Sequence, residues 1–263
     1  MSQSRLPGED LIERGVADLD AGIVSIEALL VSIGAPRLRG IGLRVPATIH
    51  SPERRLYDLL ADSDPDSAHA RYGGLLRRFV RCERSSQFPP VRSSRLRGFL
   101  AALAAHAREE TRVYLTGGAT AILEGWRAEA IDVDLKIVPE SDALLLAVSS
   151  LRWNLEIHVE LAAPDQFLPE LPGWADRSAF LERIGLVSFY HYDFYAQALA
   201  KIERGHQQDL VDVREMLDRR RIGPFQLLRH FEEIEPKLYR FPAVDPKAFR
   251  RAVERIVDPR GGN

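Results

Sequence analysis

Two stretches in the middle of the chain have the hydrophobic patterns of β-strands, and a glycine pair lies between them. Residues 112–116 form a short apolar run that ends at Gly117-Gly118. Residues 131–138 alternate strictly, so one face of the predicted strand is apolar and the other polar. The apolar positions are Val133, Leu135 and Ile137, and the polar ones are Asp132, Asp134 and Lys136. Because residues 119–126 can form one short helix, the predicted order is strand, glycine turn, helix, strand.

A third period-two stretch, from Trp153 to Leu161, predicts a further strand. Its apolar positions would pack against helices: Leu155, Ile157, Val159 and Leu161. Its polar positions would face the opposite side: Asn154, Glu156, His158 and Glu160. We therefore expect a small sheet with one polar, acid-bearing face. Residues 164–192 contain several prolines and are expected to be rich in loops.

Helical spacing of apolar residues dominates both ends of the chain. Near the N-terminus it covers 18–48, with glycine and proline breaks, and about 66–84. Ser51-Pro52 predicts a helix start between these segments, with Ser51 as the N-cap. Asp193 can cap a helix that ends near Gly205. The other predicted helices cover about 95–109, 206–220, 224–234 and 245–257.

A domain boundary is expected at the polar, proline-containing stretch 85–94, which has no periodicity. We divide the chain there into a helical N-terminal module, residues 1–88, and a second domain, residues 89–263. In the second domain the sheet core is expected at 110–162 and a helical C-terminal part at 176–258. The predicted fold class is α+β, a small mixed sheet with flanking helices.

Composition narrows the class of protein. With 263 residues, 45% hydrophobic and 28% charged, the chain can bury a sizeable core as a globular protein. The net charge of −2 provides no global basic field, and a single cysteine, Cys82, excludes an internal disulfide framework. The sequence contains neither a signal-peptide pattern nor a membrane-spanning apolar run, so we expect a cytoplasmic protein with no membrane partner.

The acid-bearing face predicts a site for a divalent cation. Residues two apart on a strand point the same way, so Asp132 and Asp134 can share a cation, with Glu160 or Glu156 as a third carboxylate. Gly117 and Gly118 allow the backbone to turn tightly and to approach a phosphate without a Cβ in the way. This set fits a metal-dependent enzyme that holds a nucleoside triphosphate. The alternative is a solvated strand face whose carboxylates bind no ligand.

The sequence Gly-Gly-Ala-Thr-Ala at 117–121, followed by Asp-Val-Asp-Leu at 132–135, resembles the signature of the nucleotidyltransferase superfamily, which has the DNA polymerase beta-like fold. Residues 198–204 and 208–213 resemble the later motifs of its abortive-infection AbiEii branch. That branch includes nucleotidyltransferase toxins of toxin–antitoxin systems. The resemblance covers about 110–220. Gly118 stands where serine is common, so Thr116 or Thr120 would have to supply the missing hydroxyl contact to phosphate.

The resemblance implies transfer of a nucleoside monophosphate from an NTP to an acceptor hydroxyl, with Mg²⁺ or Mn²⁺ as cofactor. The acceptor would be an RNA such as tRNA, or a protein, and a toxin or antitoxin partner is expected. The implied metal ligands are Asp132, Asp134 and Glu160. Gly117 and Gly118 would lie against the triphosphate, Lys201 would contact it, and Asp209 would be a supporting or catalytic acid. Residues 1–88 would form a regulatory, antitoxin-like or dimerisation module.

Several residues have competing interpretations. Lys201, one of only four lysines, is expected at a groove on the edge of an apolar helix stripe, or else as a snorkelling surface lysine. Asp209 and Asp212 also suit an ordinary acidic helix start. His191 is expected to be structural, whereas His158 could contact substrate. Arg214 and the run 219–221 are candidates for RNA phosphate contact, or form a solvated helix end. The fold could also persist as a catalytically inactive binding module, or as a transferase for a small molecule.

Overall fold

The computed structural model describes residues 9–40, 42–65, 68–85 and 88–258. The chain divides into two compact units, Met1–Phe88 and Pro89–Asn263. This division falls inside the stretch that the sequence suggests as a linker. Within the described residues, no helix has both the length and the apolar character that crossing a bilayer requires.

The first unit is helical. Its elements are α1 (Glu9–Asp20), α2 (Ile26–Gly40), α3 (Pro52–Ser63) and α4 (Ala68–Ser85). Their buried faces share one core, which includes Leu29, Leu38, Leu56, Leu60 and Phe79. The helix start at Pro52 is confirmed, but the predicted N-cap is wrong. Ser51 adopts a left-handed backbone conformation, with φ 50°, and its side chain makes no cap hydrogen bond.

The second unit combines a sheet with helices, which confirms the α+β class. Its strands are β1 (Val91–Arg92), β2 (Thr111–Thr116), β3 (Glu129–Ala130), β4 (Val133–Val138), β5 (Val159–Glu160), β6 (Ala179–Ile184) and β7 (Val187–His191). Its helices are α5 (Ser93–Ala104), α6 (Gly117–Leu123), α7 (Asp142–Asn154), α8 (Trp174–Arg177), α9 (Phe194–Arg204), α10 (Gln207–Asp218), α11 (Pro224–Ile234) and α12 (Pro246–Val257), with 3₁₀ turns η1 (Pro164–Gln166) and η2 (Glu235–Arg240). The larger sheet has the strand order β5-β4-β2-β7-β6, and β1 pairs with β3 separately.

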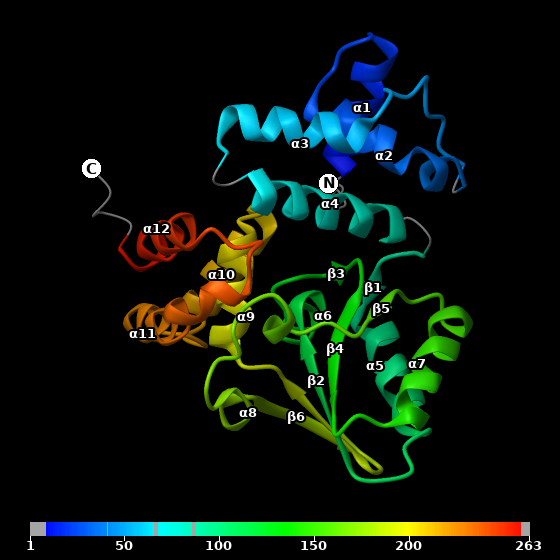
Figure 1. Ribbon diagram of the computed structural model, residues 1–263. Helices are drawn as coiled ribbons and strands as arrows, with labels where there is room; N and C mark the ends of the chain where they lie inside the picture. The colour runs from blue at the N-terminus through cyan, green and yellow to red at the C-terminus, as the bar shows by residue number, and fades with distance from the viewer. Residues whose placement is uncertain (1–8, 41, 66–67, 86–87, 259–263) are drawn as a thin grey trace. The chain divides into compact units, whose positions relative to one another are not determined.

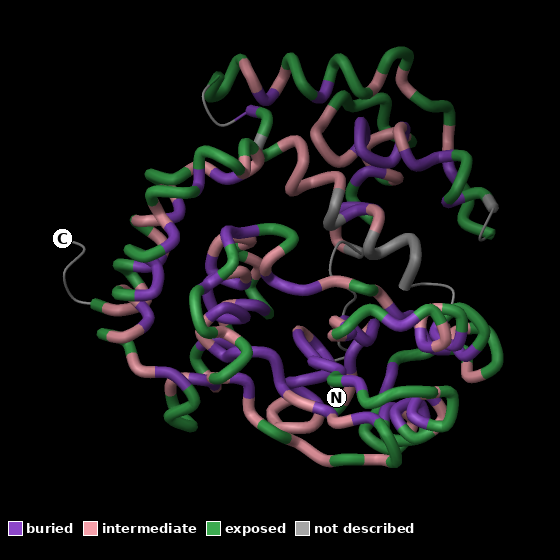
Figure 2. Tube along the Cα trace, turned by 60° about the horizontal axis from the view of Figure 1, so that its bottom comes forward, coloured by how far each residue is buried: buried purple, intermediate pink, exposed green. Residues whose placement is uncertain are grey.

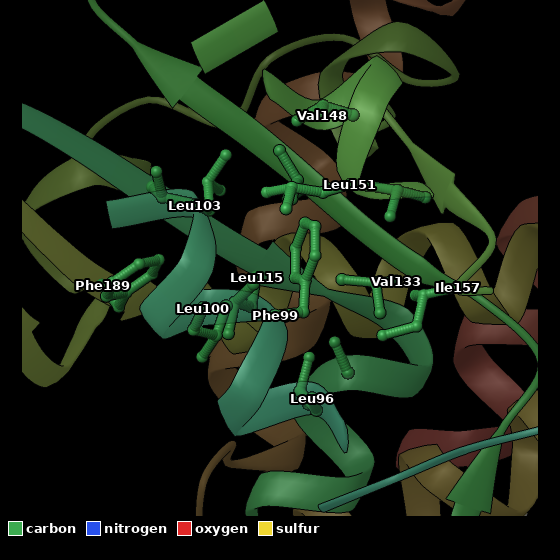
Figure 3. Packing of buried hydrophobic residues seen from close by; sticks show 14 of the residues in the cluster. Leu96, Phe99, Leu100, Leu103, Leu115, Val133, Val148, Leu151, Ile157 and Phe189 are labelled. Carbon is green, nitrogen blue, oxygen red and sulfur yellow. The ribbon is translucent and has the colours of Figure 1, made fainter. Parts of the chain in front are cut away.

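The larger sheet is mixed, and its alternating side chains divide the second unit into two cores. β4 pairs antiparallel with β2, whereas β2–β7 and β4–β5 are parallel pairs. Leu115 on β2 and Val133 on β4 pack against Phe99 of α5 and Leu151 of α7 (Figure 3). Helices α5 and α7 lie together on this side of the sheet (Figure 1). Tyr114, which points to the opposite face of β2, belongs to the second core.

The second core is built from the C-terminal helices. Buried and exposed positions alternate along the segment that leads to the C-terminus, as expected for amphipathic helices (Figure 2). The Asp193 side chain accepts a hydrogen bond from the N–H of Tyr195, and Gly205 ends α9 with φ 66°. Both predicted ends of α9 are therefore confirmed. The later helices α10, α11 and α12 also lie where the sequence predicts them.

The predicted strand from Trp153 to Leu161 is wrong for most of its length. Its first residues end helix α7, and only Val159–Glu160 form β5. Between these elements Glu156 has φ 51°, which turns the chain out of the helix and onto the sheet. Ile157 and Val159 are nevertheless buried as expected, whereas Leu161 is exposed. A period-two pattern of nine residues therefore covered a helix end, a turn and a two-residue strand.

Two segments expected to be irregular are partly regular. Residues 164–192 contain the hairpin β6–β7, whose strands pair antiparallel around Gly185 at φ 57°. The second half of the expected linker is also structured. Val91 is buried and pairs with Ala130, and α5 begins at Ser93. Prolines and serines favour the prediction of loops, so the sequence pattern does not predict these strands and this helix start.

Candidate metal and phosphate site

Three carboxylates converge at the edge of the larger sheet. Asp134 on β4 lies directly across from Glu160 on β5 in the parallel ladder, and Asp132 comes just before β4. One carboxylate oxygen from each residue lies within 4.8 Å of the others. Asp132 and Asp134 are only 1% and 6% exposed, and Glu160 is half-buried. The third carboxylate is thus Glu160 and not Glu156, which lies in the exposed turn after α7.

Carboxylates this close repel one another, and burial strengthens the repulsion because water screens them less. A divalent cation held among them would offset that repulsion. All three donors are carboxylate oxygens, the ligand type that Mg²⁺ and Mn²⁺ prefer. The donor set therefore fits a hard divalent cation.

The imidazole of His158 contacts the carboxylate of Glu160. The Nε2 atom of His158 lies 3.0 Å from Oε1 of Glu160, and the imidazole is almost completely buried. Groups that hydrogen-bond to metal-binding side chains orient them. The expectation that His158 could contact substrate is not met, because its side chain is only 1% exposed and its Nε2 contacts Glu160.

Gly117 packs closely against the carboxylate of Asp134, and Gly118 packs closely against Ala130. Gly117 has φ 60°, and a Cβ at this position would lie 2.5 Å from Oδ2 of Asp134. A Cβ at Gly118 would lie 2.5 Å from the Cβ of Ala130. Real Cβ atoms do not come this near to other atoms, so both positions require glycine. The pair therefore permits α6 to start directly beside the carboxylate cluster.

Thr116 and Thr120, the two candidates for a hydroxyl contact to phosphate, have different surroundings. Thr116 pairs with Asp134 across β2 and β4, at the mouth of the glycine turn. Thr120 is fully buried, and its hydroxyl donates to the carbonyl of Leu115 at 3.1 Å. The suggested phosphate contact by Thr120 is therefore wrong, because its hydroxyl faces the core. The suggested contact by Thr116 stays a prediction.

Lys201 lies in a buried cluster of ion pairs between α9 and α10. Its Nζ atom is 3.0 Å from Oδ1 of Asp209 and 2.6 Å from Oδ2 of Asp212. Arg127 binds both oxygens of Asp212, at 2.8 and 2.6 Å, and Arg204 contacts Asp209 at 3.0 Å. Only 3% of Lys201 is exposed. Neither the groove-edge interpretation nor the snorkelling interpretation of Lys201 is correct.

The charges of this cluster largely cancel. Burial raises the pKa of Asp209, but Lys201 and Arg204 lower it by more, so the net pKa lies well below its usual range. Asp209 is therefore ionised at neutral pH and poorly suited to accept a proton. A triphosphate contact by Lys201 would require its pairs with Asp209 and Asp212 to open.

The arginine run after α10 is not simply a solvated helix end. Arg221 binds both carboxylate oxygens of Glu124 at 2.9 Å, and Arg219 donates to the carbonyl of Glu124 at 3.0 Å. His191 also contacts Glu124, with its Nε2 3.4 Å from Oε1 of that residue. Burial and Arg221 lower the pKa of His191, although Glu124 opposes them. His191 is structural, as expected, and Arg214 remains exposed.

Gln197 is a site residue that the sequence patterns did not indicate. It lies on α9 and is buried, and its Oε1 accepts a hydrogen bond of 3.0 Å from the N–H of Gly117. The available signal was a polar side chain on the apolar stripe of α9, one turn before Lys201. A glutamine at such a position must find buried hydrogen-bond partners.

Comparisons with protein-family models, with curated proteins and with solved structures found no match to this chain. Interpretation of the site therefore depends on its own residues. They bring together Asp132, Asp134 and Glu160 beside the Gly117 turn, whereas Lys201 and Asp209 belong to a separate cluster.

Proposed function

We propose that this protein is a nucleotidyltransferase that uses Mg²⁺ or Mn²⁺ to transfer a nucleoside monophosphate from an NTP to an acceptor hydroxyl. The observation that carries the proposal is the convergence of Asp132, Asp134 and Glu160 within 4.8 Å, next to a glycine turn that lies against Asp134. The acceptor oxygen would form a bond to the α-phosphorus while the bond to the β-phosphate oxygen breaks. Pyrophosphate would leave, and the hydroxyl proton would pass to solvent.

In this proposal the three carboxylates hold the cation, and His158 keeps Glu160 in place. When bound, such a cation activates the attacking hydroxyl and neutralises charge on the leaving pyrophosphate. The lack of a Cβ at Gly117 lets the turn lie directly against Asp134, so a phosphate on the cation would lie beside this turn. We assign Lys201 and Asp209 to the support of α9 and α10, because their charges are paired with one another.

The acceptor class and the biological context are supported by the sequence resemblance alone. An RNA such as tRNA, or a protein, is the proposed acceptor, and a toxin–antitoxin pair is the proposed setting. A catalytically inactive binding module is the second candidate. The observation that favours it is the neutralised Lys201, which leaves the proposed triphosphate site without that cation.

The direct test is label transfer. The protein is incubated with Mg²⁺ or Mn²⁺, each α-labelled NTP, and total cellular RNA or protein as acceptor. Active wild type labels one acceptor, and the double variant Asp132→Asn, Asp134→Asn loses at least about 100-fold, as expected when metal ligands are removed. Glu160→Gln should show a similar loss. Glu156→Gln is the matched control, because this glutamate lies outside the cluster. Equal labelling by wild type and double variant contradicts the proposal.

A second measurement separates an inactive module from a misfolded variant. The melting temperatures of wild type and of the double variant are measured in EDTA and again with Mn²⁺. Wild type should gain stability on addition of Mn²⁺, whereas the double variant should not. Wild type that gains stability with Mn²⁺ but transfers no label would support the binding module. Wild type that shows neither effect excludes the metal site altogether.

A further inference from the structure

We propose that Gln197 is a positioning residue of this site: its buried amide fixes the peptide of Gly117 and so holds the glycine turn against Asp134. The effect on catalysis rests on the proposed nucleotidyl transfer, whereas the effect on metal binding does not. The hydrogen bonds of Gln197 join it to Gly117, Tyr192 and Thr120.

The surroundings of Gln197 make its hydrogen bonds necessary. It lies on α9, is 1% exposed, and has apolar neighbours in Ala196, Ala198 and Leu199. A buried amide group costs several kcal/mol of transfer free energy, on the order of 2–7, unless it finds partners. Methionine or leucine would suit the apolar face of α9 without this cost. The presence of glutamine therefore indicates that its partners matter.

The partners of Gln197 lie at two neighbouring junctions between a strand and a helix. Oε1 accepts from the N–H of Gly117 at 3.0 Å, where β2 leads into α6. Nε2 donates to the carbonyl of Tyr192 at 2.7 Å, where β7 leads into α9, and lies 3.4 Å from Oγ1 of Thr120. Strands β2 and β7 are parallel neighbours. One side chain thus links the C-terminal ends of both strands.

The bond to Gly117 controls the geometry next to the metal ligands. The first N–H groups of a helix have no partner within the helix, and Gln197 supplies one for Gly117. Glycine at φ 60° has little steric restriction of its own, so an external hydrogen bond is needed to fix its peptide plane. Because Asp134 lies against the Cα of Gly117, a change in this plane would move the space that Asp134 occupies. The same bond also means that the N–H of Gly117 is not available to a phosphate.

The test compares Gln197→Met with Gln226→Met. Methionine resembles glutamine in length and removes all three side-chain hydrogen bonds of Gln197. Gln226 on α11 is half-buried and contacts His230, so its variant is a control in which the hydrogen bond that is lost does not involve the glycine turn. Mn²⁺ affinity is measured by calorimetry on folded protein. We expect Gln197→Met to weaken Mn²⁺ binding about tenfold, the lower end of the range for outer-shell partners. In the transfer assay, Gln197→Met should lower kcat by a larger factor than it changes KM. Gln226→Met should leave both quantities unchanged.

A merely structural role predicts a different result. In that case Gln197→Met would lower the melting temperature but bind Mn²⁺ like wild type, and the proposal would be overturned.

Hydrogen exchange of wild type provides a test that needs no variant. The amide of Gly117 should exchange slowly, like amides within strands, and exchange at the rate of an exposed loop would also overturn the proposal. If wild type binds Mn²⁺ but transfers no nucleotide, the proposed function fails while the role of Gln197 is still decided by these two measurements. If wild type binds no Mn²⁺, hydrogen exchange alone decides it.

Discussion

The carboxylate of Asp134 occupies the space that a side chain on Gly117 would need. A Cβ at position 117 would come 2.5 Å from Oδ2 of Asp134, and the glycine also has a left-handed backbone, with φ 60°. Two independent requirements therefore apply at one position. The glycine turn and the carboxylate cluster form a single packed unit, in which neither residue can change without moving the other.

Gly117→Ala should consequently weaken both folding and metal binding. The left-handed backbone costs a residue with a Cβ about 1–2 kcal/mol, and displacement of Asp134 adds to this. Gly125→Ala is the matched control, because Gly125 has φ 80° but a Cβ added there would meet no atom within 4 Å. It should lose stability only through the backbone. All three tryptophans lie in the second unit, so urea unfolding followed by tryptophan fluorescence reports on the correct part of the chain. Equal stability losses and unchanged Mn²⁺ affinity in both variants would contradict the prediction.

Lys201→Met should destabilise the second unit severely. Removing one partner of a buried ion pair typically costs about 3–5 kcal/mol, and the loss here should lie near the lower end because two arginines still pair with the two aspartates. Here Asp209 and Asp212 would each lose their contact with Lys201, although Arg204 and Arg127 would remain. Urea unfolding followed by tryptophan fluorescence measures the change. Lys237→Met, at an exposed position, should stay within about 0.5 kcal/mol of wild type.

The opposite outcome for Lys201 would restore its role at the triphosphate. If Lys201→Met is as stable as wild type but raises KM for the NTP at least tenfold, then the ion pairs open during binding. The structural assignment of this lysine would then be wrong.

The acidic site could be predicted from the sequence to a large degree, and partly for an incorrect reason. Asp132 and Asp134 follow from a period-two pattern, and the structure has a strand there that contains Asp134 and begins directly after Asp132. The pattern predicts Glu160 from a nine-residue strand, of which only Val159–Glu160 are a strand in the structure. Its position was still correct because Ile157 and Val159 are buried, so the inward and outward positions near Glu160 kept the expected order.

The environment of Lys201 could not be predicted in this way. Its partners lie eight and eleven residues further along, on the next helix. Acidic residues near the start of a helix are common for reasons of local electrostatics, so Asp209 and Asp212 gave no distinct signal. Gln197 was missed for the same reason: its partners at Gly117 and Tyr192 are brought close by tertiary packing. Local patterns therefore predict strand faces and helix ends, but not contacts across helices.

His191 should make the stability of the second unit depend on pH in a defined direction. Its pKa in the folded protein is lowered from 6.5, chiefly by burial, with Glu124 opposing and Arg221 adding to the shift. The unfolded chain therefore takes up a proton more readily. The contribution of His191 to stability is complete above about pH 6.5 and falls as the pH decreases through the window below that value.

His191→Gln removes this titrating group and retains hydrogen-bonding capacity. The difference in unfolding free energy, wild type minus variant, should decrease between pH 7.5 and pH 5. Tryptophan-monitored urea unfolding at several pH values measures it. A difference that grows as the pH falls would mean that protonated His191 is stabilised by Glu124, contrary to the lowered pKa.

Lys136 lies two residues after Asp134 on the same strand, which suggests a role in the site. The lysine forms an ion pair with Asp165, and its Nζ lies 4.8 Å from the ring centroid of Trp174. The two charged side chains are 27% and 16% exposed, so water screens them only in part.

We expect Lys136→Met and Asp165→Asn each to destabilise the second unit, with a coupling energy of about 1 kcal/mol in a double-mutant cycle. Mn²⁺ affinity should not change, because the charge of Lys136 is already balanced by Asp165. If Lys136→Met instead tightens Mn²⁺ binding while Asp165→Asn weakens it, then both charges act on the carboxylate cluster directly, and Lys136 belongs to the site.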